Sequence, residues 1–283
     1  MNRILTFACM AFIGLAHAAE RPVVLNKSLP LRSGTVLREK REIRVENGVS
    51  KKVNAKETTE VRTRYLQRIN LIRRITGAGS EEIRASEFMT ELVHFTGPPP
   101  PPAEEPSPLM SKTMRARKTG ARWDYDLDRG KETPAERTSL DDLAYSAALL
   151  DMISLCIGNE AHKVDDTWKT SIPAPRGKAV GYVVPKDVEC TLVSLNETAD
   201  GPHAVIAIRG SLGLERPKGY NAHVDITFEA TVVRRLADML DVDTDIKGEY
   251  ILKGEANIAG VGKTKLDFNY PFTLTRNLKL EDK

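Results

Sequence analysis

The chain has 283 residues, of which 41% are hydrophobic, and its 42 lysines and arginines nearly balance its 39 aspartates and glutamates. This length can bury one large β domain or two small ones. The near-neutral charge indicates no nucleic-acid or membrane-surface partner for the chain as a whole, and the 6% aromatic content argues against the sugar-stacking cleft of a glycosidase.

The N-terminus has the pattern of a secretory signal peptide. Arg3 makes the start positive, residues 4–16 form a short apolar core, and Ala16-His17-Ala18 is a small-x-small cleavage site. We therefore expect residues 1–18 to be removed and the protein to be secreted or periplasmic, as in bacteria. The apolar core is shorter than the about 20 residues of a transmembrane helix, and no later segment approaches that length. The mature chain is therefore not expected to span a membrane.

Residues 19–97 are predicted to form an N-terminal β segment. Between residues 34 and 75 an apolar series falls on odd positions, which favours long, curved strands. The series consists of Val49, Val53, Val61, Tyr65, Ile69 and Leu71. A turn at 77–80 then leads into a further strand at 83–95.

The same β segment is basic, with twelve lysines or arginines and five glutamates between Arg38 and Arg74. Such a face could dock an envelope protein or an anionic surface through Arg62, Arg64 and Arg68. The alternative is a solvated strand face whose charges protect sheet edges. Tyr65 is the only aromatic residue here, so nucleic acid is not expected as a partner.

Residues 98–108 are rich in proline, which cannot donate hydrogen bonds to a sheet and favours an extended polyproline conformation. The segment is either a linker between two lobes or a long loop. Residues 109–283 are expected to hold a helix and a C-terminal meander. Whether they form one domain with residues 19–97 is left open.

One substantial helix is predicted near 139–157, after a strand pair between Met110 and Asp126. Ser139 is expected as its N-cap, Asp141 and Asp142 lie in its positive first turn, and leucines recur at helical spacing. This helix should cover one face of a sheet.

The clearest periodicity lies in the C-terminal third. Apolar residues alternate with polar ones over 222–232, 250–258 and 266–274, which indicates strands with one wet face. Gly254 stands on the apolar side as an expected bulge or bend. The predicted fold class is therefore mainly β: curved antiparallel meander sheets, half-barrel-like, with one covering helix near 139–157.

Cys156 and Cys190 are the cysteines that remain after signal removal. In an oxidising compartment a disulfide between them is favoured. The alternative is two separately buried thiols, because Cys190 alternates with Val188 and Leu192 as a core residue would.

No constellation in the sequence compels a reaction. His94, His162, His203 and His223 do not have the spacing of metal ligands, and there is no Gly-x-Ser-x-Gly nucleophile turn. The alternating Asp241, Asp243 and Asp245 lack the remainder of a calcium loop and are interpreted as the solvated face of a strand. We therefore assign no catalytic residue, metal ligand or cofactor.

The segment Val164-Asp165-Asp166-Thr167-Trp168 follows the predicted helix and precedes the meander. Over about Met110 to Leu280 the chain resembles uncharacterised secreted bacterial β-rich proteins that carry a Val-x-Gly-Asp-x-Trp turn in this place. Asp165 stands where glycine is expected. Those proteins look like relatives of half-barrel lipoprotein carriers, in which a curved antiparallel sheet wraps an apolar cavity and a helix plugs it.

This resemblance and the supply of apolar positions favour a non-enzymatic binding protein that holds a lipid or other amphipathic ligand on a concave sheet. The residues expected to line the concave face are Val224, Ile226, Phe228, Tyr250, Leu252, Phe268, Tyr270 and Phe272. The same positions would also suit an ordinary packed core. The other functions left open are a structural or interaction module of the cell envelope and a hydrolase whose carboxylate pair is assembled by the fold.

Overall fold

The computed structural model describes residues 21–25, 31–119, 122–170, 183–214, 220–258 and 262–281. The predicted signal peptide, residues 1–18, lies outside these residues.

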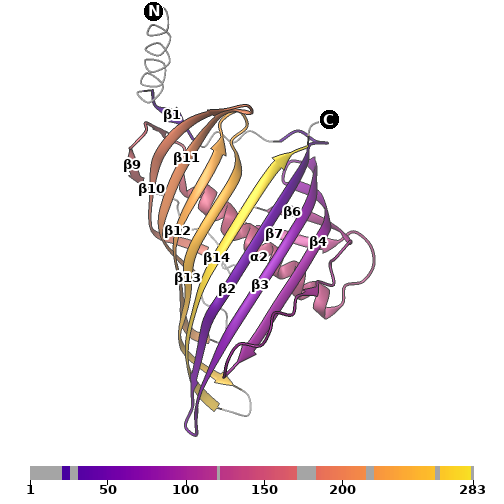
Figure 1. Cartoon of the computed structure of the whole chain (residues 1–283), viewed down its shortest axis with the longest axis vertical. Coiled ribbons are helices and arrows are strands. Elements are labelled where there is room, and N and C mark those ends of the chain that lie inside the picture. Colours follow the sequence, from indigo (N-terminus) through magenta and orange to yellow (C-terminus); the bar gives the residue numbers. More distant parts are fainter. Residues whose placement is uncertain are drawn as a thin grey trace, which may run out of the picture.

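Twelve of the described strands form one long antiparallel sheet that is not closed, and it curves around a single helix, α2 (Pro134–Cys156) (Figure 1). The order across the sheet is β7-β6-β4-β3-β2-β14-β13-β12-β11-β10-β9, with β5 also paired to β4. The strands are β2 (Val36–Val53), β3 (Thr58–Gly77), β4 (Ser80–Phe95), β5 (Glu105–Pro106), β6 (Thr113–Thr119), β7 (Arg122–Leu127), β9 (Thr167–Lys169), β10 (Val183–Thr198), β11 (Gly201–Leu214), β12 (Tyr220–Arg235), β13 (Leu240–Ile258) and β14 (Gly262–Leu280). Two short strands, β1 (Val23–Val24) and β8 (Ala161–His162), pair separately. The predicted fold class is confirmed.

The last strand of the chain joins the first long one, since β14 pairs with β2 (Figure 1). Residues on both sides of the proline-rich segment therefore contribute to one sheet. The segment itself runs back along β4: Glu105–Pro106 forms β5, the Ala103 amide donates to Glu91 Oε1 at 3.2 Å, and Glu104 pairs with Arg68.

Helix α2 begins five residues before the expected start. Its N-cap is Thr133 rather than Ser139, and Thr133 and Glu136 form a reciprocal capping box with Pro134 in the first turn. The prediction was wrong here because the apolar face begins only at Leu140, whereas the first turn is fixed by capping. Gly158 follows the helix with a φ of 76°, a left-handed conformation that glycine adopts at little cost.

The helix packs on the inner face of the sheet through two separate apolar clusters. Its N-terminal half, with Leu140 and Leu143, packs against β3, β4, β6 and β7. Its C-terminal half, with Leu150 and Ile153, packs against β10 to β14. Each cluster removes the apolar face of one wing of the sheet from water, at about 25 cal/mol per Å² buried.

A buried ion network lies between these two clusters. Arg41 donates through Nε to Glu39 Oε1 at 2.9 Å and through Nη1 to Ser146 Oγ of α2. Arg73 bridges Glu39 and Glu81, and its Nε and Nη2 reach the Glu81 carboxylate at 2.7 and 2.8 Å. Glu39, Arg41 and Arg73 belong to the segment whose charges were expected on an outer face. Glu39 and Arg41 are instead buried, as is Glu81, which is tolerated because each is paired.

A second buried arginine ties the other half of the helix to the sheet. Arg234 on β12 is 1% exposed and donates three bonds of 2.6 Å, to Asp241 Oδ1, Leu25 O and Ser154 Oγ. The interpretation of Asp241 as part of a solvated face was wrong. The register shifts between Val233 and Arg234, which turns Asp241 inward while Asp243 stays exposed.

Glycines on the inner face mark where the sheet bends. A Cβ on Gly248 would overlap the carbonyl oxygen of Thr227 and lie 2.9 Å from the Phe272 ring, and a Cβ on Gly48 would overlap the Tyr270 ring. Register shifts accompany Gly48 on β2 and Pro271 on β14. The bulge expected at Gly254 is absent from the pairing, because its register with both neighbours runs without a shift.

The turn at 164–168 packs against the C-terminal end of the helix. Trp168 donates from Nε1 to the Ile157 carbonyl at 2.9 Å and stacks on His162 with 3.6 Å between ring centroids. Asp165 adopts a φ of 69°, so aspartate occupies a left-handed position where the resemblance expects glycine.

Replacing Glu39 with glutamine should test the buried ion network. Burial alone would raise the pKa of the Glu39 carboxyl, but Arg41 and Arg73 hold the pKa well below its usual range. We expect Glu39→Gln to lower the free energy of unfolding at pH 7 by about 3–5 kcal/mol, because it removes the shared partner of two buried cations. Urea unfolding followed by circular dichroism measures this loss.

The same variant should show a defined pH dependence. A carboxyl with a lowered folded-state pKa stabilises fully above its unfolded pKa of about 4.3 and loses that contribution as pH falls through the folded value. The difference in the free energy of unfolding between wild type and Glu39→Gln should therefore become smaller below about pH 4. Glu42→Gln, which breaks only the partly exposed pair with Arg44, is the control and should cost less than about 1 kcal/mol. An equal loss in the free energy of unfolding for both variants would contradict the stabilising role of the buried ion network.

Candidate functional site

A cavity of about 540 Å³ lies between the inner face of the sheet and helix α2. Small-molecule sites usually measure about 300–1,000 Å³ and are mainly apolar, so this cavity has the size and character of one. Five strands and the helix contribute its lining, which consists of Ile43, Val45, Tyr65, Gln67, Asp142, Tyr145, Ser146, Leu149, Ile226, Tyr250, Leu252, Phe268, Tyr270, Phe272 and Leu274.

The cavity brings together six of the eight residues predicted to line a concave face. They are Ile226, Tyr250, Leu252, Phe268, Tyr270 and Phe272. Val224 and Phe228 are buried, 5% and 4% exposed, and do not line it. Phe228 instead packs in the cluster under the C-terminal half of α2. Contact of any of these residues with a ligand stays a prediction.

The remaining lining residues were missed, although part of their signal is visible in the sequence. Asp142, Tyr145, Ser146 and Leu149 are spaced i, i+3, i+4 and i+7, which places them on one face of α2. Tyr65 had been recognised on the apolar side of its strand. No local signal shows that β2 and β3 lie beside β14, since that pairing joins opposite ends of the chain.

The cavity has a buried end and a more exposed end. Gln67, Ser146 and Leu274 are each 1% exposed and lie next to the buried ion network, with Ser146 accepting from Arg41. Tyr145 is 42% exposed, and Asp142 beside it is also exposed, so these two residues form the rim.

Aromatic rings form much of the wall of the cavity. Tyr250 and Tyr270 stack with 6.1 Å between centroids, and Phe268 lies 6.0 Å from Tyr270, whose hydroxyl bonds to Ser50. Burial raises the pKa of Tyr65 and of Tyr145, so both phenols stay protonated at neutral pH. Partial removal from water at the rim likewise raises the pKa of Asp142, with the neighbouring Asp141 charge adding to the effect. The wall is thus apolar with uncharged hydroxyl groups.

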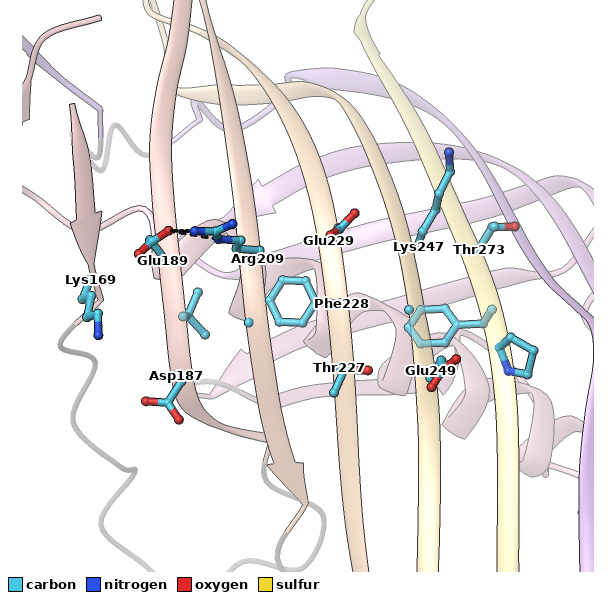
Figure 2. A pocket seen from close by; sticks show the side chains of 15 residues that line it. Lys169, Asp187, Glu189, Arg209, Thr227, Phe228, Glu229, Lys247, Glu249 and Thr273 are labelled. Atoms are coloured by element: carbon cyan, nitrogen blue, oxygen red, sulfur yellow. Dashed lines mark hydrogen bonds and ion pairs between the residues drawn. The ribbon is translucent and has the colours of Figure 1, made fainter. Parts of the chain in front are cut away.

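A second hollow lies on the outer face of the sheet, across β9 to β14. Figure 2 shows charged side chains of alternating sign on successive strands, with Glu189 and Arg209 joined by an ion pair whose Nε–Oε1 distance is 2.9 Å. Glu229 and Lys247 continue the series (Figure 2). This hollow follows the sheet bend at Gly210 and Gly248. The alternation of charges across neighbouring strands, with Glu189 paired to Arg209, is that of an ordinary solvated face.

The three arginines expected to dock a partner also lie on this outer side of the sheet. Arg64 pairs with Glu91, its Nη2 2.5 Å from Oε1, and Arg68 pairs with Glu104. Arg62 is exposed. Two of the three charges are therefore neutralised by neighbouring glutamates, and the docking role stays a prediction.

Cys156 and Cys190 are both free and buried. The favoured disulfide is thus not formed in this structure, and the alternative of two buried thiols describes it. Cys190 donates from Sγ to the Cys156 carbonyl at 3.3 Å, and burial raises the pKa of both thiols to about 12.

Within the described ranges, no three histidine, cysteine or acidic side chains are grouped so that they could hold a metal ion. In the same part of the chain, no helix combines the length and the apolar character needed to cross a membrane.

No protein-family model and no curated protein matches the sequence. Among solved structures, one of lipovitellin, described as showing lipid–protein interactions, is similar to this chain with a TM-score of 0.39 and 8% sequence identity. The match covers 89% of this chain and 25% of the lipovitellin chain. OccK11 from Pseudomonas aeruginosa has a TM-score of 0.16 and 9% sequence identity, and the match covers 89% of this chain and 100% of the OccK11 chain. An outer membrane channel from Pseudomonas putida F1 gives 0.14 at 9% identity, covering 91% and 100%. This chain thus spans a quarter of the lipovitellin chain, and these low TM-scores establish no shared fold.

The two thiols should be unreactive in the folded protein. At pH 8 we expect iodoacetamide to leave Cys156 and Cys190 unlabelled, because both are inaccessible and protonated, and to label both fully in 6 M guanidinium. Peptide mass spectrometry reads each residue separately. A disulfide would leave both unlabelled in guanidinium until a reductant is added, which would contradict the free-thiol state.

Proposed function

We propose that the protein is a non-enzymatic carrier that holds one lipid-like amphipathic molecule in the cavity between the sheet and α2. The observation that supports this most is the cavity itself, about 540 Å³ in volume and lined mainly by aliphatic and aromatic side chains. An apolar chain placed there would gain about 25 cal/mol for each Å² removed from water.

The lining favours binding over catalysis. It contains one carboxyl group, Asp142 at the rim, and no histidine or cysteine among the described lining residues. The buried carboxylates of Glu39, Glu81 and Asp241 form ion pairs with arginines. A hydrolase with a paired-carboxylate centre would need two such groups facing a substrate.

The compartment forms part of the same proposal. The predicted signal peptide supports a carrier that works in a secretory space, where an apolar molecule needs a protein to shield it from water.

A cavity-filling variant tests the carrier function. Val45 lines the cavity and is partly buried, so Val45→Trp should occupy space that a ligand would use. We expect it to weaken binding of the fluorescent probe N-phenyl-1-naphthylamine at least about tenfold, or about 1.4 kcal/mol. Titration of probe fluorescence gives the affinity, and thermal unfolding verifies the fold.

Val193→Trp is the matched control, because Val193 is 46% exposed on β10 and lies away from the cavity. It should bind the probe like wild type. Unchanged binding in Val45→Trp, or no probe binding by the wild-type protein, would overturn the carrier proposal.

The N-terminal processing is tested by intact mass. We expect the full chain, expressed in a bacterial host and purified from the periplasm, to have the mass of a polypeptide that begins at Ala19. A change of Ala16 and Ala18 to arginine should block cleavage. An unprocessed wild-type chain retained in the cytoplasm would contradict the proposed compartment.

A further inference from the structure

Gln67 is a polar side chain placed inside the cavity without a partner. It is 1% exposed, it lines the cavity, and neither its Oε1 nor its Nε2 has a hydrogen-bond partner among the described residues. Leaving a buried polar group unpaired costs about 1–3 kcal/mol. The packing of the fold therefore gives no reason for an amide at this position, whereas a ligand would.

Its place in the sheet puts this amide at the buried end of the cavity. Gln67 pairs with Ile43 on β2, and Ile43 pairs with Leu274 on β14, so the three residues form one row across the inner face. Ser146 of α2 lines the same end. Farther along the same strands the lining residues Tyr65, Tyr270 and Phe268 are only half-buried, so a molecule that enters from that side meets Gln67 with its leading end.

The charged side chains next to this end do not line the cavity. Arg41 precedes Ile43 by two residues on the same face and is bonded to Glu39 and Ser146. Arg276 follows Leu274 and contacts Asp241 and Thr244 through Nη2, whereas its buried Nε has no hydrogen-bond partner among the described residues. A charged group moved into this end would lose its hydration without meeting a counter-ion among the residues that line this end, which is costly.

A carboxamide presents a donor and an acceptor side by side. Its best partner is therefore an uncharged group that can both accept and donate, such as a hydroxyl, an amide or a protonated carboxyl. The apolar walls toward Leu252 and Phe268 suit the chain that carries this group.

We propose that Gln67 is the polar anchor of the cavity and that the ligand is a single-chain amphipath whose uncharged hydrogen-bonding end group lies against it. This inference rests on the proposed carrier function. It reverses the orientation expected for a lipid held by its tail, because the polar end lies deepest.

Two probes of equal chain length separate the hydrogen bond from apolar burial. The end groups of 1-decanol and 1-chlorodecane are similar in size. Only the hydroxyl of the alcohol can both donate a hydrogen bond to Gln67 Oε1 and accept one from Gln67 Nε2. Affinities are obtained by displacement of N-phenyl-1-naphthylamine from wild type and from Gln67→Met, which keeps the side-chain length. We expect the variant to bind 1-decanol about tenfold more weakly, or about 1.4 kcal/mol, and 1-chlorodecane within about twofold of wild type.

Gln67→Met should fold, with a melting temperature equal to or above that of wild type, because it removes an unpaired buried polar group. Asn70→Leu, which removes an amide from the same strand where Asn70 bonds to Glu87, is the matched control and should leave both affinities unchanged. An equal effect of Gln67→Met on both probes, or no effect on either, would overturn the anchor role while the carrier function stands. If the wild-type protein binds none of the three compounds, both proposals are overturned.

Discussion

The attachment of α2 to the sheet by two buried arginines sets the architecture of this protein. Arg41 and Arg234 reach from β2 and β12 to Ser146 and Ser154, which lie two turns apart on the helix. Each arginine is held by a carboxylate of the sheet, so both charges are buried in pairs. Because the helix is bonded to the sheet at two points, it bridges the concave face of the sheet and does not pack against it along its whole length.

The cavity follows from this bridging position. The two halves of α2 pack on opposite wings of the sheet, and the buried polar groups occupy the middle. Beside them the helix leaves the inner face of β2, β3, β13 and β14 uncovered, and aromatic side chains line the space that results. The glycines at 48 and 248 give room to the rings of Tyr270 and Phe272 there. The same features that curve the sheet therefore also shape the site.

Much of the fold was predictable because strands and helices leave local patterns. Alternation identified the inward faces of β12, β13 and β14, and six of the eight residues predicted from them line the cavity. The start of α2 was not found, since it depends on the Thr133 capping box and not on the apolar face. Glu39, Arg41 and Asp241 were assigned to solvent because a charged residue carries no local sign of the partner that will bury it.

The sequence by itself determined which strand faces are apolar, that one helix would cover them, and that the N-terminus has the pattern of an export signal. Those properties depend on neighbours within a few residues. Only the tertiary structure decided that β14 pairs with β2, that Gln67 faces a cavity without a partner, and that Cys156 and Cys190 stay unbridged. Each of these depends on the approach of segments distant in the chain, and the register shifts that direct the approach have no signature in hydrophobic periodicity.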